Sequence, residues 1–279
     1  MAVSLLVGGV DVMKNWDAFA TFMDSVESAK DGLGLRSHQD AFFRGHSKST
    51  YTLLPSLFRQ NCKSADEFWK LERRSFFHFR ALARELHAAD RLDWDVLFHM
   101  QHHGLPTRLL DWTSVFGVAL YFALLGHQGE TEPLPCIWLL NPYALNKATW
   151  DTYNLFDPKY LARDEQKNRT YDYGELLLDV HPEGSGRLPW GNPLAIYTTQ
   201  RSDRMFVQSG WFTIHGTNIA PLEDILRDRP EVLRKVDVPT VAIPAAKEFL
   251  ALAGIGHRQL FPGLDGLAKS VKERFEITR

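Results

Sequence analysis

The chain has 279 residues, of which 44% are hydrophobic and 24% charged, a composition that excludes a disordered polypeptide and suffices for a well-buried core. Its 32 basic and 34 acidic side chains leave a formal charge of −2, so the molecule as a whole lacks the strongly basic balance of many nucleic-acid-binding proteins. Cys62 and Cys136 are its only cysteines, which excludes a four-cysteine zinc site and suits a reducing compartment. We therefore expect a cytoplasmic protein.

The first residues are apolar, but no basic segment precedes them and Asp11 interrupts them. They resemble neither a signal peptide nor a membrane-spanning helix, and no other apolar run approaches membrane length. We expect no membrane partner.

Apolar spacing predicts a mainly helical first part, residues 1–105. Large apolar residues recur at intervals of three and four over 15–29, which predicts an amphipathic helix. A short aromatic strand is expected at 41–45, and a second helix over about 65–88 begins with a capping box formed by Ser64 and Glu67. A third helix, 95–103, is expected to end at Gly104 as a left-handed cap.

The pattern then changes to apolar runs typical of strands, which predicts a sheet-rich part over 106–243 and C-terminal helices over 244–279. The expected strands and extended segments are 107–112, 136–140, 194–199, 205–207, 211–215 and 239–243. The expected helices are 116–125, 220–234, 245–254 and 265–276. Residues 155–193, which carry several prolines and glycines, are expected to be a loop-rich middle segment. The fold class is therefore α+β.

The densest polar segment is 99–113, where His, Gln, Arg, Asp and Thr side chains stand too close together in sequence for most of them to be buried. An unpartnered polar group taken out of water costs about 1–3 kcal/mol, so such a segment is expected to line a cleft. His99 and His103 also stand four residues apart, a spacing typical of helical metal ligands, and Asp111 or His46 could complete such a site. A metal-dependent nuclease is therefore one alternative, although no metal is expected because no Glu stands beside the first His.

Four motifs occur along the chain in an order that resembles the FRG domain family. They are Phe42-Phe-Arg-Gly45, the segment from Gln101 to Thr113 followed by Ala119-Leu-Tyr-Phe-Ala123, Gln208-Ser-Gly-Trp-Phe-Thr213, and Leu260-Phe-Pro-Gly-Leu-Asp-Gly266. The resemblance extends over about 40–268, and we expect one domain over 1–279. The last motif is expected to be structural, turning the chain into its final helix.

The order of the first three motifs is also similar to the ADP-ribosyltransferase pattern, which implies a mixed or antiparallel central sheet and NAD as co-substrate. By this resemblance Arg44 anchors NAD, because a guanidinium fork suits a phosphate oxygen pair. Gly45 offers bare backbone to the nicotinamide amide. Thr113, or Ser114 beside it, corresponds to the hydroxyl that holds the arginine.

At the position where many ADP-ribosyltransferases have Glu, this chain has Gln208. A glutamine can contact the ribose but brings no negative charge, so another carboxylate is needed, with Asp111 and Asp203 as candidates. Arg201 and Arg204 lie just upstream and could contact a diphosphate or a nucleic acid. With Gln208, they favour RNA over protein as the acceptor.

The remaining expected pocket residues are Phe43 and Trp112 as flat apolar faces, His46, His102 and His103 around the nicotinamide, and Asp111 as ion-pair partner of Arg108 or Arg44. The setting implied by the resemblance is a bacterial toxin or anti-phage defence, with a possible antitoxin partner covering the cleft. The alternative from a different class is a non-catalytic module that senses NAD or a nucleotide, which the missing Glu favours.

Overall fold

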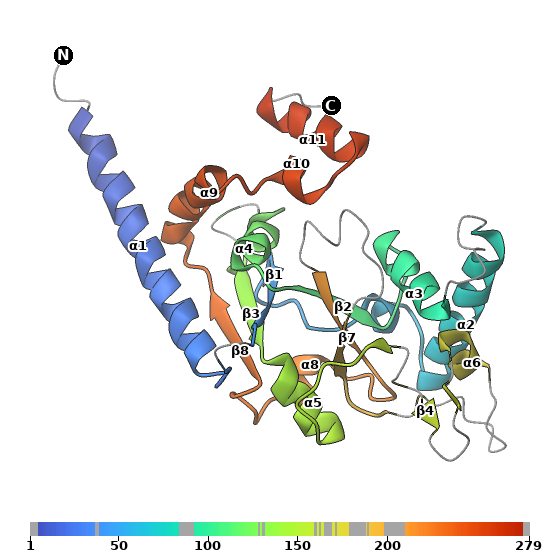
Figure 1. Cartoon of the computed structure of the whole chain (residues 1–279). Coiled ribbons are helices and arrows are strands. Elements are labelled where there is room, and N and C mark those ends of the chain that lie inside the picture. Colours follow the sequence, from blue (N-terminus) through green and yellow to red (C-terminus); the bar gives the residue numbers. More distant parts are fainter. Residues whose placement is uncertain are drawn as a thin grey trace.

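The structure is a computed structural model of the whole chain, drawn in Figure 1. It describes residues 5–36, 39–83, 92–127, 129, 132–158, 161, 163–164, 169–170, 172–178, 188, 190–197 and 210–275. The expected strand at 205–207 lies outside the described residues. Within these ranges no helix combines the length and the apolar character that crossing a bilayer requires.

The centre of the molecule is an antiparallel sheet of six strands in the order β6-β7-β2-β1-β3-β8. The strands are β1 (Phe42–His46), β2 (Leu109–Thr113), β3 (Cys136–Leu140), β6 (Leu194–Ile196), β7 (Gly210–Ile214) and β8 (Leu233–Asp237). A separate pair, β4 (Arg163–Asp164) and β5 (Arg169–Thr170), completes the described strands. The expected α+β class with a central sheet is confirmed.

Helices surround this sheet on both faces and at one end (Figure 1). They are α1 (Leu5–Asp31), α2 (Ala65–Leu82), α3 (Asp93–His102), α4 (Phe116–Leu124), α5 (Pro142–Trp150), α6 (Tyr173–Leu177), α8 (Leu222–Ile225), α9 (Ile243–Leu252), α10 (His257–Leu260) and α11 (Leu264–Arg274), with 3-10 turns η1 (Ser56–Arg59) and η4 (Thr240–Ala242).

One hydrophobic core joins α1, α4 and α9 to one face of β1 and β3. Phe19, Phe22 and Val26 of α1 are buried there with Phe43 of β1 and Ile137 of β3, so the apolar spacing over 15–29 does mark the buried side of a helix. A second core packs α2, α3 and α6 against β2, β6 and β7. A third packs α5 and α8 against the face of β1 and β3 that α4 leaves uncovered.

Local signals for helix ends are confirmed in part. The Ser64 hydroxyl accepts a hydrogen bond from the Glu67 backbone N–H (3.2 Å) and so caps α2, but the Glu67 carboxylate accepts from the Lys63 N–H (2.8 Å) instead of from Ser64, so the expected capping box does not form. Gly104 ends α3 with φ +77°, a conformation that glycine adopts without strain. From Gly104 the chain continues into the rest of the polar segment.

Two expectations for the later chain are wrong. Residues 239–243 form η4 and the start of α9 rather than a strand, because Pro239 has no N–H for a ladder and Pro244 suits the first turn of a helix. The strand in this region is β8 instead, and it includes the last residues of the expected helix 220–234. Of that expected helix, only α8 is helical. The segment 155–193, expected to be rich in loops, contains the short elements α6, β4 and β5. The helix α5, capped by Asn141, was not predicted.

Candidate functional site

The sheet opens between β1 and β2. These two strands share a single paired position, Phe43 with Thr113, whereas β1 pairs with β3 at Phe42–His46 and β2 pairs with β7 at Leu109–Thr113, each over its whole length. A pocket of about 390 Å³ lies where β1 and β2 diverge, and this volume falls in the range of small-molecule sites. Its walls come from β1, the end of α3, β2 and one side of α4.

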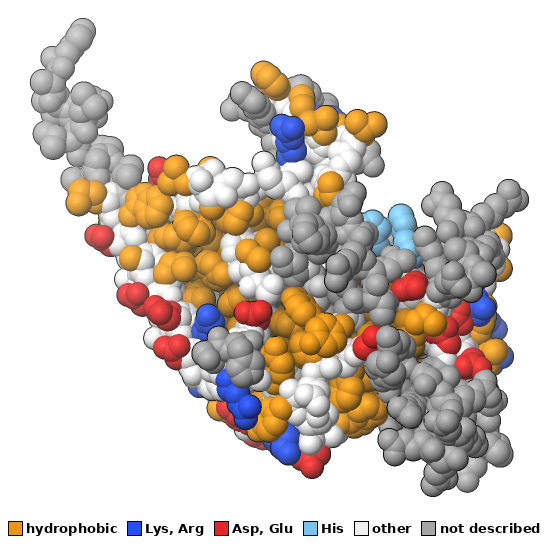
Figure 2. Space-filling model, viewed as in Figure 1, with side chains coloured by type: hydrophobic (Ala, Val, Ile, Leu, Met, Phe, Trp, Pro, Cys, Tyr) orange, Lys and Arg blue, Asp and Glu red, His pale blue; other side chains and the backbone are white. Residues whose placement is uncertain are grey.

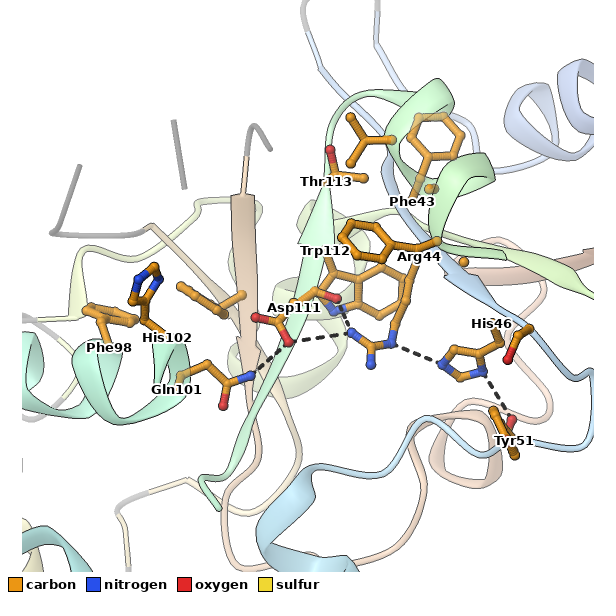
Figure 3. A pocket seen from close by; sticks show the side chains of 16 residues that line it. Phe43, Arg44, His46, Tyr51, Phe98, Gln101, His102, Asp111, Trp112 and Thr113 are labelled. Atoms are coloured by element: carbon orange, nitrogen blue, oxygen red, sulfur yellow. Dashed lines mark hydrogen bonds and ion pairs between the residues drawn. The ribbon is translucent and has the colours of Figure 1, made fainter. Parts of the chain in front are cut away.

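Arg44 crosses this opening from β1 to β2 (Figure 3). Its Nε donates to His46 Nε2 (3.1 Å) and its Nη1 donates to the backbone carbonyl of Asp111 (2.5 Å), a carbonyl on the β2 edge facing the opening. Nη2 makes no hydrogen bond within the described part of the chain. Burial lowers the pKa of Arg44 and the Asp111 carboxylate opposes that shift. The pocket therefore has a fixed, charged guanidinium whose Nη2 is unused within the described residues.

His46 is the residue that holds the other end of Arg44. Its Nδ1 lies 3.2 Å from the backbone carbonyl of Tyr51, and since a carbonyl only accepts, Nδ1 carries the proton and Nε2 is the acceptor for Arg44. Burial first, and then the charge of Arg44, lower the pKa of His46 to about 3. The imidazole is neutral at physiological pH.

Asp111 supplies a carboxylate to the opposite wall. It is the one exposed residue in the buried strand β2, with 59% of its side chain accessible. Gln101 Nε2 donates to its Oδ2 (2.8 Å), and Arg44 Nη1 lies 3.8 Å from the same oxygen. The Thr107 hydroxyl donates to the Gln101 carbonyl and so orients the amide. Oδ1 has no hydrogen-bond partner among the described residues.

Gly45 lines the pocket but has a structural role that the sequence did not indicate. A Cβ added there would lie 2.5 Å from the backbone nitrogen of Ala123 and closer still to the carbonyl oxygen of Ala119. The side-chain face of Gly45 is thus filled by α4. For the expected contact with a nicotinamide amide, Gly45 can therefore offer only its backbone atoms on the pocket side.

Thr113 lines the pocket, but it does not hold Arg44 as expected. Its hydroxyl accepts from the Val115 N–H (3.1 Å) at the start of α4, and Figure 3 shows it apart from the guanidinium. Arg44 is held instead by His46 and by the carbonyl of Asp111. Because Thr113 pairs with Phe43, the residue before Arg44, it lies on the other face of the two strands.

The expected aromatic faces are largely core. Trp112 is 3% exposed and its indole N–H donates to the Thr213 hydroxyl (3.0 Å), while Phe43 packs edge-on against Phe116. Both border the pocket, and so do Phe98, Phe122 and Phe212, which the sequence analysis did not single out.

The histidines of α3 divide between pocket and surface. His102 lines the pocket, whereas His103 is exposed at the end of the helix and does not border it. The pale blue side chains over the end of α3 in Figure 2 lie at the molecular surface. Rings of His99 and His103 stack with centroids 6.3 Å apart. Among the residues described, no cluster of three or more His, Cys, Asp or Glu could hold a metal ion.

Arg108 is not a pocket residue, which corrects its expected role. It is 3% exposed and its Nε donates to Glu72 (2.7 Å), while Nη1 donates to the carbonyls of His215 and Gly216 (both 2.9 Å). The Tyr173 hydroxyl completes this cluster. Burial lowers the pKa of Arg108, but the Glu72 carboxylate reverses the shift and raises it. The partner of Asp111 is therefore Arg44.

Gln208, Arg201, Arg204 and Asp203 lie outside the described residues, so their expected roles stay predictions. Gln101 lies inside the polar segment but had no expected role, and its position next to the last residue of α3 was the available signal. The Tyr51 carbonyl is a backbone group, and no side-chain pattern could have indicated it.

The architecture and the site define an α+β protein with a ligand-sized pocket in a divided antiparallel sheet. Residues 39–132 match the family model of the FRG domain, so the chain contains an FRG domain over these residues. The match includes β1, α2, α3, β2 and α4, and hence nearly every wall of the pocket. The motifs at Gln208 and at Leu260–Gly266 lie outside it. Searches of curated proteins and of solved structures found no match.

Proposed function

We propose that this protein is an NAD-dependent ADP-ribosyltransferase whose reaction takes place in the pocket between β1 and β2. The observation that carries the proposal is the unused Nη2 of Arg44, a charged nitrogen with two N–H donors held in fixed orientation inside a pocket of ligand size. Each of these N–H groups can donate to a phosphate oxygen, and NAD carries two phosphates. The order of the sequence motifs, which resembles the ADP-ribosyltransferase pattern, adds to this support.

The reaction needs a group that favours positive charge on the sugar. The bond between ribose C1′ and the nicotinamide nitrogen breaks, the bonding electron pair leaves with neutral nicotinamide, and C1′ becomes cationic. A nucleophile of the acceptor then bonds to C1′ and gives up its proton to water. Asp111 is the carboxylate that we assign to the cationic sugar, because its Oδ1 is unused and Gln101 fixes its Oδ2. A preorganised charge of this kind lowers the barrier without reorganisation.

A second candidate is a module that binds NAD or a nucleotide without turnover. The specific observation in its favour is that Asp111 shares its charge with Arg44, 3.8 Å away, and with the donating amide of Gln101. Both contacts reduce the field available to a developing cation. Calorimetric binding of NAD with no release of nicotinamide over hours would favour this module over the enzyme.

Label transfer tests the enzyme directly. NAD labelled in the adenylate is incubated with the wild type or with Arg44→Ala, together with separate RNA and protein pools. The proposal expects label in one pool with the wild type and loss of about two orders of magnitude in the variant. Label in RNA would bear out the expected acceptor, and label only in protein would exclude it. No transfer and no free nicotinamide with either pool would contradict the enzyme.

A further inference from the structure

We propose that His46 is a positioning residue that holds Arg44 by its Nε and so leaves the Nη2 edge of the guanidinium free to receive an anion in the pocket. This inference rests on the proposed function for its natural ligand, NAD, but its geometry stands on described contacts alone.

The strand geometry brings the two side chains together. Arg44 and His46 are two residues apart in β1, and side chains at that spacing point to the same face of a strand. The result is a direct hydrogen bond from Arg44 Nε to His46 Nε2 (3.1 Å). Nη1 is held at the other side by the Asp111 carbonyl. Two anchors on different nitrogens fix the plane of the guanidinium and not merely its place.

His46 acts as an acceptor only because its other nitrogen is fixed. The Tyr51 carbonyl, 3.2 Å from Nδ1, requires the proton to sit on Nδ1. His46 is 6% exposed, so water does not compete for Nε2. The imidazole, a carbonyl from the following loop and the guanidinium therefore form one chain in Figure 3.

The charges around His46 keep it neutral. Arg44 on β1, Arg59 at the end of η1 and Lys235 on β8 all lower the pKa of His46 in addition to burial. Its strand partner Cys136 on β3 is itself neutral, because burial raises the pKa of that thiol to about 12. A protonated imidazole would lose its acceptor and repel Arg44.

An arginine fixed in this way has lost its rotamer freedom before the ligand arrives. Ordering a long side chain on binding costs affinity, so prior ordering favours the bound state. Lysine could not replace Arg44, because its donors share a single nitrogen, so it has no planar group that His46 and the Asp111 carbonyl could fix through two nitrogens while a third faces the ligand.

Two substitutions separate the positioning role from a structural one. In His46→Gln the amide oxygen stands near the position of Nε2 and can accept from Arg44, whereas in His46→Asn the amide stands near Nδ1 and keeps only the Tyr51 contact. We expect His46→Gln to bind NAD within about threefold of the wild type and His46→Asn to lose about tenfold or more. His78→Gln on the exposed side of α2 is the matched control. Equal binding by the Gln and Asn variants, or stronger binding by Asn, would overturn the proposal.

The probes distinguish failure of this inference from failure of the proposed function. Binding is measured by calorimetry for NAD and for inorganic pyrophosphate. If the wild type binds pyrophosphate but not NAD, and the variants rank as above, the transferase is wrong and the role of His46 stands. If the wild type binds neither anion, both proposals are wrong.

Nitrogen-15 NMR of the whole chain checks the same contact without any ligand. It also serves as the test if one of the variants fails to fold. We expect His46 to show a protonated Nδ1 and an unprotonated Nε2, and this protonation state should not change between pH 5 and 8. In Arg44→Gln the pKa of His46 should rise, since a neighbouring positive charge is gone. Titration of His46 near its ordinary value in the wild type, or a proton on Nε2, would contradict the proposal.

Discussion

Arg44 and Arg108 both lie in motifs that the sequence analysis assigned to the cleft, but the structure surrounds them differently. All three guanidinium nitrogens of Arg108 donate to protein groups, and its side chain is 4% exposed beside Glu72. Arg44 uses two nitrogens, and its side chain is 22% exposed beside a carboxylate that it does not directly hydrogen-bond. An arginine whose three nitrogens all donate to protein groups stabilises the fold, whereas one with an unused nitrogen in a pocket can bind a ligand.

Substitution of each arginine by alanine gives the strongest test of this comparison. We expect Arg108→Ala to lower the free energy of unfolding by about 3–5 kcal/mol, because it leaves the Glu72 carboxylate buried and unpaired. Arg44→Ala should cost about 1 kcal/mol or less, since its ion pair is long and partly exposed. Urea unfolding followed by circular dichroism measures both. Equal losses for the two variants would break the distinction.

Gly45 tests how closely the pocket strand depends on α4. Gly45→Ala places a methyl group against the backbone of Ala119 and Ala123, and we expect about 1–3 kcal/mol of destabilisation, or more if the helix cannot shift. Gly191→Ala is the control, because a Cβ there meets its nearest neighbour, Thr217 Oγ1, at 3.9 Å. Thermal melting of the two variants gives the difference. A Gly45→Ala protein as stable as the control would show that β1 and α4 do not pack as described.

Acid should destabilise both regions through a neutral histidine in each. Burial lowers the pKa of His46 beside Arg44 and of His215 beside Arg108 to about 3, against about 6.5 in the unfolded chain. Between these values the unfolded chain binds more protons, so the stabilisation is complete above pH 6.5 and is lost as pH falls toward 3. The slope reaches about 1.4 kcal/mol per pH unit for each histidine.

Urea midpoints at pH 7.5, 6 and 5 measure this slope. His215→Asn should reduce it, and His78→Gln, on an exposed helix face, should leave it unchanged. A free energy of unfolding that stays constant from pH 7.5 to 5 would mean that neither imidazole is held neutral.

Gln101 gives the smallest expected effect and concerns the Arg44 side alone. Gln101→Leu removes the donor to Asp111 and the acceptor of the Thr107 hydroxyl. We expect nicotinamide release to fall about tenfold with little change in melting temperature, because the carboxylate loses its orientation but remains in place. Gln259→Leu, exposed on α10, is the matched control. An unchanged rate in Gln101→Leu would show that Asp111 needs no support from α3.

The sequence predicted those helices, strands and helix ends whose signals are local in the chain. The apolar run of β3, the aromatic β1 and the glycine that ends α3 carry their own signals, and each was found where expected. The apolar residues at 239–243 were misleading because a 3-10 turn that leads into a helix can carry the same short apolar run as a strand. Arg108 contacts a buried glutamate thirty-six positions earlier in the chain, whereas Arg44 faces an open pocket. This difference depends on long-range packing, which no local spacing encodes.

The pocket itself was predictable only in part. The polar segment 99–113 does border it, and Arg44, His46, His102 and Asp111 do meet there. The divergence of β1 from β2 creates the space, and this follows from a single shared pair between two strands that pair fully with their other neighbours. Tyr51 contributes through its carbonyl, and Arg44 is held by groups other than the expected hydroxyl.

The most direct test of the account is the initial rate of nicotinamide release from NAD by the wild type and by Arg44→Ala, both confirmed to be folded. The account predicts measurable release by the wild type and a loss of about a hundredfold in the variant. No release by the wild type, or an unchanged rate after Arg44 is removed, would contradict it.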